Sequence, residues 1–176
     1  MKEPADLKGL KIRLQSNPVH IATFEQLGAS PVSIDGSEMF AAMSQGVVDG
    51  QENPYAVINT FRLYDAKQKF MSDTGHFFDV IVFAVSKSML DAMSEEDRAA
   101  VIEAGRLATL EQRKLVAADE AKNLEAILSH GVEFTKLTKE QREAFRTATL
   151  PVYDVVRERL GADLVDELTT AVDAAK

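Results

Sequence analysis

The sequence predicts an α/β fold in which short strands alternate with helices. In the first half of the chain, apolar runs of a few residues are separated by longer stretches with the apolar spacing of helices. The second half contains a stretch from Ser94 to about Ser129 with neither proline nor a turn cluster, which is typical of a long helix. The 176 residues are 45% hydrophobic and 27% charged, an ordinary mix for a globular protein with one core or two small lobes.

A strand, a helix and a second strand are expected first. Residues 11–15 form the first strand, after which Pro18 favours the first turn of a helix. That helix ends near Gly28. Residues 29–34, which are again largely apolar, form the second strand.

A second helix and a polar turn follow. Asp35 or Ser37 is its expected N-cap, and Gly46 is its expected C-terminal stop. Residues 47–54 are too short and polar for a buried strand throughout, and the proline that ends them biases Asn53 toward an extended conformation. We therefore expect this tight segment to fix the direction of its side chains.

The middle of the chain combines a predicted strand with a long helix. Residues 77–86 are the most apolar stretch and are rich in β-branched and aromatic residues, which predicts a strand. Ser94–Asp97 resembles a capping box that opens the long helix. A helix of about 36 residues reaches roughly 54 Å, so it must bridge two lobes, pair with another chain or kink, with Gly105 as one place to bend.

The last third is predicted to be mostly helical. Residues 132–136 form a last short strand, and Thr138–Gln141 is a second capping box. Breaks are expected at Leu150–Pro151 and at Gly161.

Charge and cysteine content exclude several classes of function. The 20 basic residues are scattered among 28 acidic ones, and the net charge of −8 argues against a nucleic-acid partner. The absence of cysteine excludes disulfides, thiolate zinc sites and cysteine nucleophiles. No run of about 18 apolar residues is present, so no membrane-spanning helix is expected.

Enzyme motifs are absent from the sequence. It contains no nucleophile elbow, no phosphate-binding loop, no dinucleotide-type glycine triplet and no paired-histidine zinc motif. His20, His76 and His130 lie far apart in the sequence, so a shared metal site is not expected, and neither is a cofactor.

Two residues remain as candidates for a binding site. Arg13 ends the first strand just before a helix start, where its planar fork would hold a carboxylate through two parallel hydrogen bonds. By position alone, a surface ion pair is the more common use of such an arginine. Asn53 would offer a ligand both a donor and an acceptor, although an Asx turn is the more common use of such an asparagine.

The order and spacing of several segments closely resemble the solute-binding proteins of tripartite ATP-independent periplasmic (TRAP) transporters, the DctP family. The resemblance covers essentially the whole chain. It rests on Asp6–Arg13 (DLKGLKIR), Leu27–Pro31 (LGASP), Ser37–Phe40 (SEMF), Gln45–Pro54 (QGVVDGQENP), Leu63–Asp65 (LYD), Thr74–His76 (TGH), Val85–Lys87 (VSK) and the helix start at Ser94–Asp97.

The resemblance implies a two-lobed periplasmic-binding-protein-like clamshell of type II. Such a protein is not an enzyme; it binds an organic acid, commonly a carboxylate, between its lobes and delivers it to a membrane permease. By this resemblance Arg13 pairs with the ligand carboxylate and Asn53 lines the same cleft, while Ser16 and Asn17 add polar contacts. Gly36 stands where many relatives carry an aromatic residue that packs on the ligand, so a more open pocket wall or a bulkier ligand is expected.

The resemblance also implies that the sequence covers the second lobe and a lobe-bridging helix. Residues 1–76 would form the α/β core of the ligand-binding lobe, residues 77–117 would cross to the first lobe, and residues 118–176 would return with the C-terminal helices. Family members are about twice as long and begin with a signal peptide, which this sequence does not show, so the periplasmic location is implied by resemblance only. Without the first lobe, weak ligand binding is expected, together with a homodimer or a domain-swapped dimer that exchanges helices.

Two alternatives of other classes stay open at this point. The first is a helical interaction or scaffolding module that self-associates through the long helix, although its apolar positions do not hold a strict heptad. The second is a small α/β enzyme that uses His20 or His76 as a base.

Overall fold

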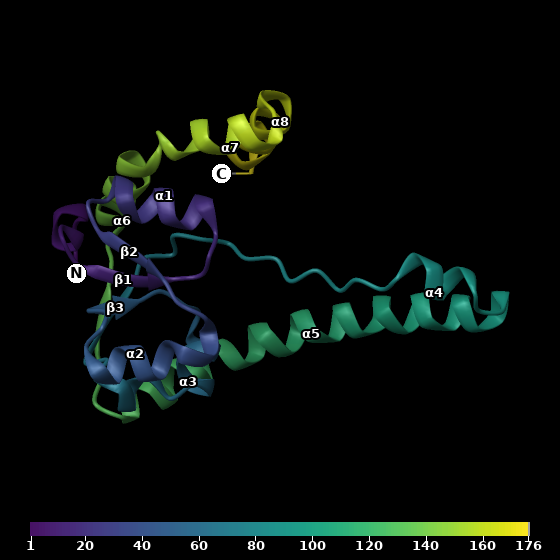
Figure 1. The fold of residues 1–176 in the computed structure, drawn as a ribbon, viewed down its shortest axis with the longest axis horizontal. Coiled ribbons are helices and arrows are strands. Elements are labelled where there is room, and N and C mark those ends of the chain that lie inside the picture. The colour runs from purple at the N-terminus through teal and green to yellow at the C-terminus, as the bar shows by residue number, and fades with distance from the viewer. Residues whose placement is uncertain (176) are drawn as a thin grey trace.

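The computed structural model describes residues 1–175, and Lys176, the last residue of the predicted third segment, lies outside them. A body formed by residues 1–76 and 118–175 carries an arm, residues 77–117, that extends far from it (Figure 1). Within the described residues, no helix combines the length and apolarity that crossing a bilayer requires.

The body contains a parallel three-stranded sheet in the order β2-β1-β3. Its strands are β1 (Lys11–Leu14), β2 (Ser30–Ser33) and the two-residue β3 (Gly50–Gln51). In this register Arg13 lies between Val32 on β2 and Gln51 on β3. The predicted strands 11–15 and 29–34 are thus confirmed to within one residue at each end.

Helices cover both faces of this sheet. α1 (Pro18–Gln26) packs on one face, where Ile12 and Leu14 form a core with Phe24. α2 (Met39–Gln45) and α3 (Tyr55–Thr60) lie on the opposite face (Figure 1). Three single 3₁₀ turns complete the first half: η1 (Pro4–Leu7), η2 (Gly36–Glu38) and η3 (Leu63–Ala66).

The helix boundaries follow the predicted caps. Asn17 is the N-cap of α1, with Pro18 as its first residue. Asp35 accepts a hydrogen bond from the Ser37 amide and opens η2, which leads into α2. Gly46 ends α2 with a φ of 73°, a left-handed conformation that glycine adopts without a steric penalty.

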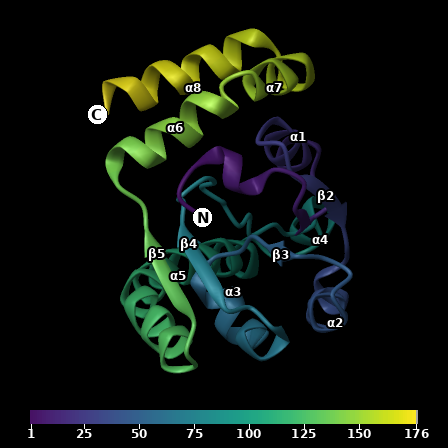
Figure 2. The ribbon, with the colours of Figure 1, turned by 90° about the vertical axis from the view of Figure 1, so that its left-hand side faces the viewer.

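A second, two-stranded parallel sheet joins distant parts of the chain. It consists of β4 (Phe70–Asp73) and β5 (Glu133–Lys136), which lie side by side in Figure 2. The strand expected at 132–136 is confirmed. The sequence analysis contained neither β4 nor α3.

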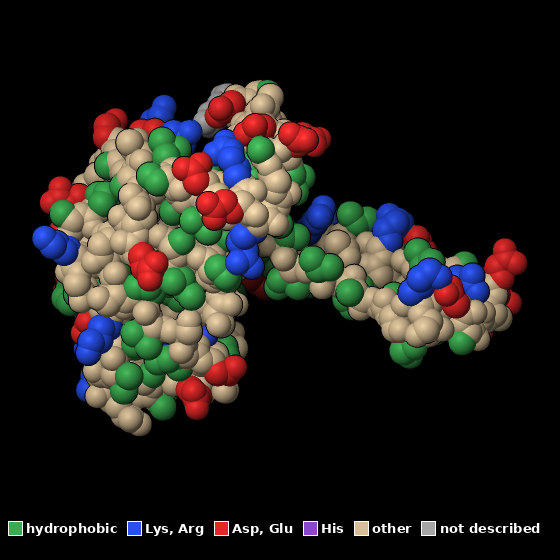
Figure 3. Space-filling view, turned by 45° about the horizontal axis from the view of Figure 1, so that its top comes forward, with side chains coloured by type: hydrophobic (Ala, Val, Ile, Leu, Met, Phe, Trp, Pro, Cys, Tyr) green, Lys and Arg blue, Asp and Glu red, His purple; other side chains and the backbone are tan. Residues whose placement is uncertain are grey.

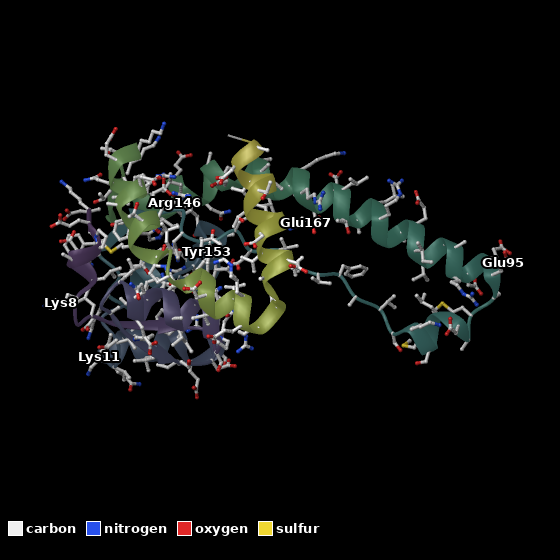
Figure 4. The ribbon with its side chains drawn as sticks, turned by 90° about the horizontal axis from the view of Figure 1, so that it is seen from above. Lys8, Lys11, Glu95, Arg146, Tyr153 and Glu167 are labelled. Carbon is white, nitrogen blue, oxygen red and sulfur yellow. The ribbon has the colours of Figure 1, made fainter. Side chains whose placement is uncertain are left out.

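The long helix is continuous. α5 runs from Glu95 to Ser129, capped by the Ser94 hydroxyl, which accepts from the Asp97 amide at 3.1 Å. Its last turns are anchored in the body, where Ile127 is fully buried, and Glu95 lies at the far tip of the arm (Figure 4). The helix does not break at Gly105. Instead, a Cβ at Gly105 would meet the Phe83 ring at 3.3 Å, so glycine permits this close approach.

The strand predicted at residues 77–86 is wrong. The segment is extended but forms no strand; it runs from the body to the short helix α4 (Lys87–Asp91) at the tip (Figures 1 and 4). A strand needs a neighbour for its backbone hydrogen bonds, and no strand within residues 1–175 pairs with this segment. From residue 78 on, its side chains are accordingly exposed, with Phe78 at 93%.

Three helices complete the body. They are α6 (Lys139–Thr149), α7 (Val152–Leu160) and α8 (Ala162–Ala174), and the interruptions between them confirm the predicted breaks at Leu150–Pro151 and Gly161. Thr138 and Gln141 form the predicted capping box. α6 and α7 pack near α1, so the three helices lie on its side of the sheet (Figure 2).

Candidate functional site

The carboxyl ends of the three parallel strands converge on one edge of the body. Arg13 lies near the end of β1, beside Val32 and Gln51 in the ladder. Ile34 lies two residues beyond Val32, and Asn53 lies two residues beyond Gln51. Both therefore lie past the carboxyl ends of the strands on either side of Arg13. In open parallel sheets this edge is the usual ligand site.

Arg13 is the centre of this edge. It is only 3% exposed, and its Nε donates to the Ile34 carbonyl oxygen at 2.9 Å. Its terminal nitrogens make no hydrogen bond to any described residue. Burial lowers the pKa of Arg13, while the negative charges of Glu52 and Asp35 act in the opposite direction. A desolvated guanidinium with two unpaired donors is suited to a bidentate carboxylate.

Asn53 belongs to a chain of amide side chains. Its Nδ2 donates to Gln51 Oε1 and lies 3.4 Å from the sulfur of Met39, and Gln51 Nε2 in turn donates to Gln68 Oε1 at 2.9 Å. This arrangement holds the Asn53 amide next to the strand that neighbours Arg13. Its carbonyl oxygen has no hydrogen-bond partner in the described chain.

Gly36 borders the Arg13 guanidinium. A Cβ built on Gly36 would lie 3.8 Å from Arg13 Nη2, with no other atom within 4 Å. The glycine therefore leaves open space beside the arginine, and a small side chain would fit there without a clash.

Ser16 and Asn17 follow β1 at the same edge. The Asn17 Oδ1 accepts from the Val19 amide at 2.9 Å and from the His20 amide at 3.4 Å, which occupies this oxygen as the N-cap of α1. Ser16 is exposed. All five predicted site residues thus lie at or beyond the carboxyl ends of β1, β2 and β3, and Asn17 is already engaged in a structural role.

A second group of side chains, which the sequence did not predict as a group, includes Glu52, whose charge acts on Arg13. We call His20, Glu52, His76 and Phe77 the Glu52 cluster. Glu52 Oε2 lies 3.4 Å from His76 Nε2, and Glu52 Oε1 lies 3.9 Å from His20 Nδ1. The His20 ring stacks on Phe77 with centroids 4.0 Å apart.

Sequence distance hid this cluster, because its histidines are 56 positions apart and only the Gln51–Pro54 motif marked Glu52. No group of three or more potential ligands in residues 1–175 is arranged to hold a metal ion.

Parallel strands that present an arginine at their carboxyl edge, with a long arm that leaves and rejoins the body, define one lobe of a two-lobed periplasmic binding protein of type II. The chain belongs to the family of bacterial extracellular solute-binding proteins, family 7 (DctP), which matches residues 1–159.

Individual relatives agree with this assignment. A solute-binding protein of Verminephrobacter eiseniae is 34% identical over 97% of this chain and 50% of its own length. The 2,3-diketo-L-gulonate-binding periplasmic protein YiaO of Escherichia coli is 35% identical over 84% of this chain and 44% of its own length. The chain therefore spans about half the length of the curated relatives it matches.

Solved structures show the same fold. A TRAP periplasmic solute-binding protein from Ralstonia eutropha with bound (S)-2-acetolactate has a TM-score of 0.85 and 35% identity, over 99% of this chain and 57% of that one. One from a Polaromonas species, bound to D-erythronate, has a TM-score of 0.87 and 33% identity, over 95% of this chain and 54% of that one. The predicted fold class and family are confirmed. These relatives are solute-binding proteins.

Proposed function

We propose that this chain is the arginine-bearing half of a TRAP solute receptor that captures a small organic acid. The observation that carries the proposal is Arg13, which is nearly buried, fixed by Ile34 and left with unpaired terminal donors. Relatives whose ligands include 2-acetolactate and D-erythronate support a 2-hydroxy acid as the ligand class.

The proposed ligand contacts extend from Arg13 along the same edge. The ligand carboxylate takes the two terminal nitrogens of Arg13, and the Asn53 carbonyl oxygen accepts from a ligand hydroxyl. Gly36 leaves room for a substituent beside the carboxylate. Ser16 contributes its hydroxyl, and Asn17 contributes through the helix that it caps.

The three segments of the chain have different proposed roles, which follow from the shape of the structure. Residues 1–76 hold the ligand, residues 77–117 cross to a first lobe, and residues 118–176 return to complete the second lobe. The arm's exposed apolar side chains support such a crossing, since a surface of this kind requires a covering partner. The receptor acts in the periplasm, delivers its ligand to TRAP permease subunits and performs no chemistry.

A second state is proposed for the chain in isolation. The arm exposes apolar side chains on both of its limbs, among them Phe78, Ile81, Phe83, Ile102 and Val116, and hydrophobic residues recur along its surface in Figure 3. A second copy would cover them in a symmetric dimer. Light scattering that finds a monomer at high micromolar concentration, with cooperative unfolding, would contradict this state.

Ligand titration followed by NMR tests the proposed function. A panel of 2-hydroxy acids and sugar acids is added at millimolar concentration, since one lobe without closure binds weakly. We expect the amides of residues 34–36 and 51–53 to shift with one acid. The shifts should vanish in Arg13→Ala and persist in Arg146→Ala, whose arginine is exposed on α6. Equal shifts in both variants would refute the role of Arg13.

A further inference from the structure

His20 lies between the loop that carries Asn53 and the first residues of the arm. Its ring stacks on Phe77 at an interplanar angle of 15°. Its Nδ1 faces Glu52 Oε1 at 3.9 Å, and its Nε2 faces Asp79 Oδ1 at 4.0 Å. A single imidazole therefore contacts both the ligand-side loop and the root of the arm.

Two polar atoms at this contact lack hydrogen-bond partners. His20 Nδ1 and Glu52 Oε1 are buried and unpaired among the described residues, in side chains that are each 9% exposed. A neutral imidazole donates from only one nitrogen, whereas an imidazolium donates from both. Since an unpaired buried polar group is costly, a proton that lets both nitrogens donate would stabilise the contact.

Charged groups from several segments surround His20. Two carboxylates, Glu52 and Asp79, face the ring from separate segments. Two groups that can carry a positive charge also interact with Glu52. They are His76, which contacts its other oxygen, and Arg13, which also interacts with Asp35. Asp79 is exposed, so it can approach the ring at little cost.

We propose that His20 is a protonation-dependent link between the Asn53 loop and the arm. Histidine ordinarily changes charge between pH 5 and 8. The imidazolium takes its second proton from solvent, donates Nδ1–H to Glu52 and Nε2–H to Asp79, and so holds Phe77–Asp79 against the body. The neutral ring keeps its stacking on Phe77 and donates from one nitrogen only, so it cannot donate to Glu52 and Asp79 together, and the root of the arm is freer to turn. The link is a property of the ligand-free chain.

The test is an NMR titration of the full chain from pH 8 to pH 5 without ligand. We expect the amides of Glu52 and Phe77–Asp79 to move with the same midpoint as the His20 ring. His76 adjoins Phe77 and contacts the same Glu52 carboxylate, so the experiment is repeated in a His76→Gln background, where the transition should remain. His130→Gln is the matched control, because His130 stacks on Tyr64 outside the Glu52 cluster.

Two variants decide the outcome. His20→Gln should abolish the transition at Phe77–Asp79. Asp79→Asn, at an exposed position, should abolish it at Phe77–Asp79 while the transition at Glu52 persists. If the Phe77–Asp79 amides titrate unchanged in either variant, or follow only the His76 ring, the proposal is wrong. No ligand takes part, so this result is independent of the proposed solute capture.

Discussion

The Nε of Arg13 donates to the Ile34 carbonyl oxygen across 2.9 Å, which ties the arginine of β1 to the exit of β2. Because the guanidinium is planar, this bond fixes the plane in which the remaining donors lie. The orientation is set in the ligand-free chain, and a carboxylate therefore meets a preorganised partner.

Replacing the planar Arg13 guanidinium by a lysine ammonium tests this preorganisation. We expect Arg13→Lys to weaken binding of the responding acid about 10- to 100-fold, since charge-assisted bidentate hydrogen bonds are lost while a positive charge remains. NMR titration measures the affinity. Arg146→Lys, at an exposed pair with Glu143, should bind as the unsubstituted chain does. Equal affinities in both variants would mean that charge alone holds the ligand.

Gly36 predicts a selectivity effect. Its added Cβ would make ordinary contact with Arg13 Nη2 at 3.8 Å, so Gly36→Ala should change the free energy of unfolding by less than about 1 kcal/mol. The methyl group narrows the space beside the guanidinium, and acids branched next to the carboxylate should lose more affinity than linear ones. Comparing such a pair of acids by titration measures this effect. An equal loss for both would show that Gly36 does not shape the pocket.

Shortening a side chain to alanine should cost different amounts of unfolding free energy at the two ends of α5. Ile127 is 0% exposed at the body end and Ile102 is 57% exposed on the arm. We expect Ile127→Ala to cost about 2–5 kcal/mol of unfolding free energy, and Ile102→Ala to cost less than about 0.5 kcal/mol. Chemical denaturation measures both. A large cost for Ile102→Ala would instead show that a second copy covers the arm.

Tyr55 predicts a loss of stability in strong base. Burial, together with the neighbouring Asp73 carboxylate, raises the pKa of Tyr55 to about 12, from 10.0 in its model compound. The folded state thus holds this proton more tightly than the unfolded state, so the contribution is complete below pH 10 and is lost as the pH rises toward 12. Thermal unfolding across this range measures it. Tyr55→Phe should show a smaller decline, and an identical decline would assign the effect to other groups.

Local signals predicted most of the body. Pro18 at the start of α1, the caps at Ser94 and Thr138 and the stop at Gly46 are short-range features, and α1, α2, α5 and α6 begin or end where the sequence indicates. β4 was missed because Phe70–Asp73 is short and half polar, and only pairing with β5, 63 positions away, makes it a strand.

The errors lie where distant partners decide the structure. Residues 77–86 have the composition of a buried strand, yet composition cannot supply a neighbouring strand. Arg13 and Asn53 were predicted from local motifs. The contact of Glu52 with His20 and His76 was not predicted, since it depends on how α1, the turn after β3 and the residues beyond β4 pack together.

The contact of Phe83 with Gly105 joins the extended limb of the arm to its helical limb, α5, and the two limbs differ in length per residue. The extended limb covers about 3.3 Å per residue and the helical limb about 1.5 Å, so ten residues of one match about 22 of the other. Deleting one residue before Phe83 would slide that ring by roughly two helical positions and turn it off the glycine. The lengths of the two limbs are therefore tied, and a viable insertion in one requires a compensating, unequal insertion in the other.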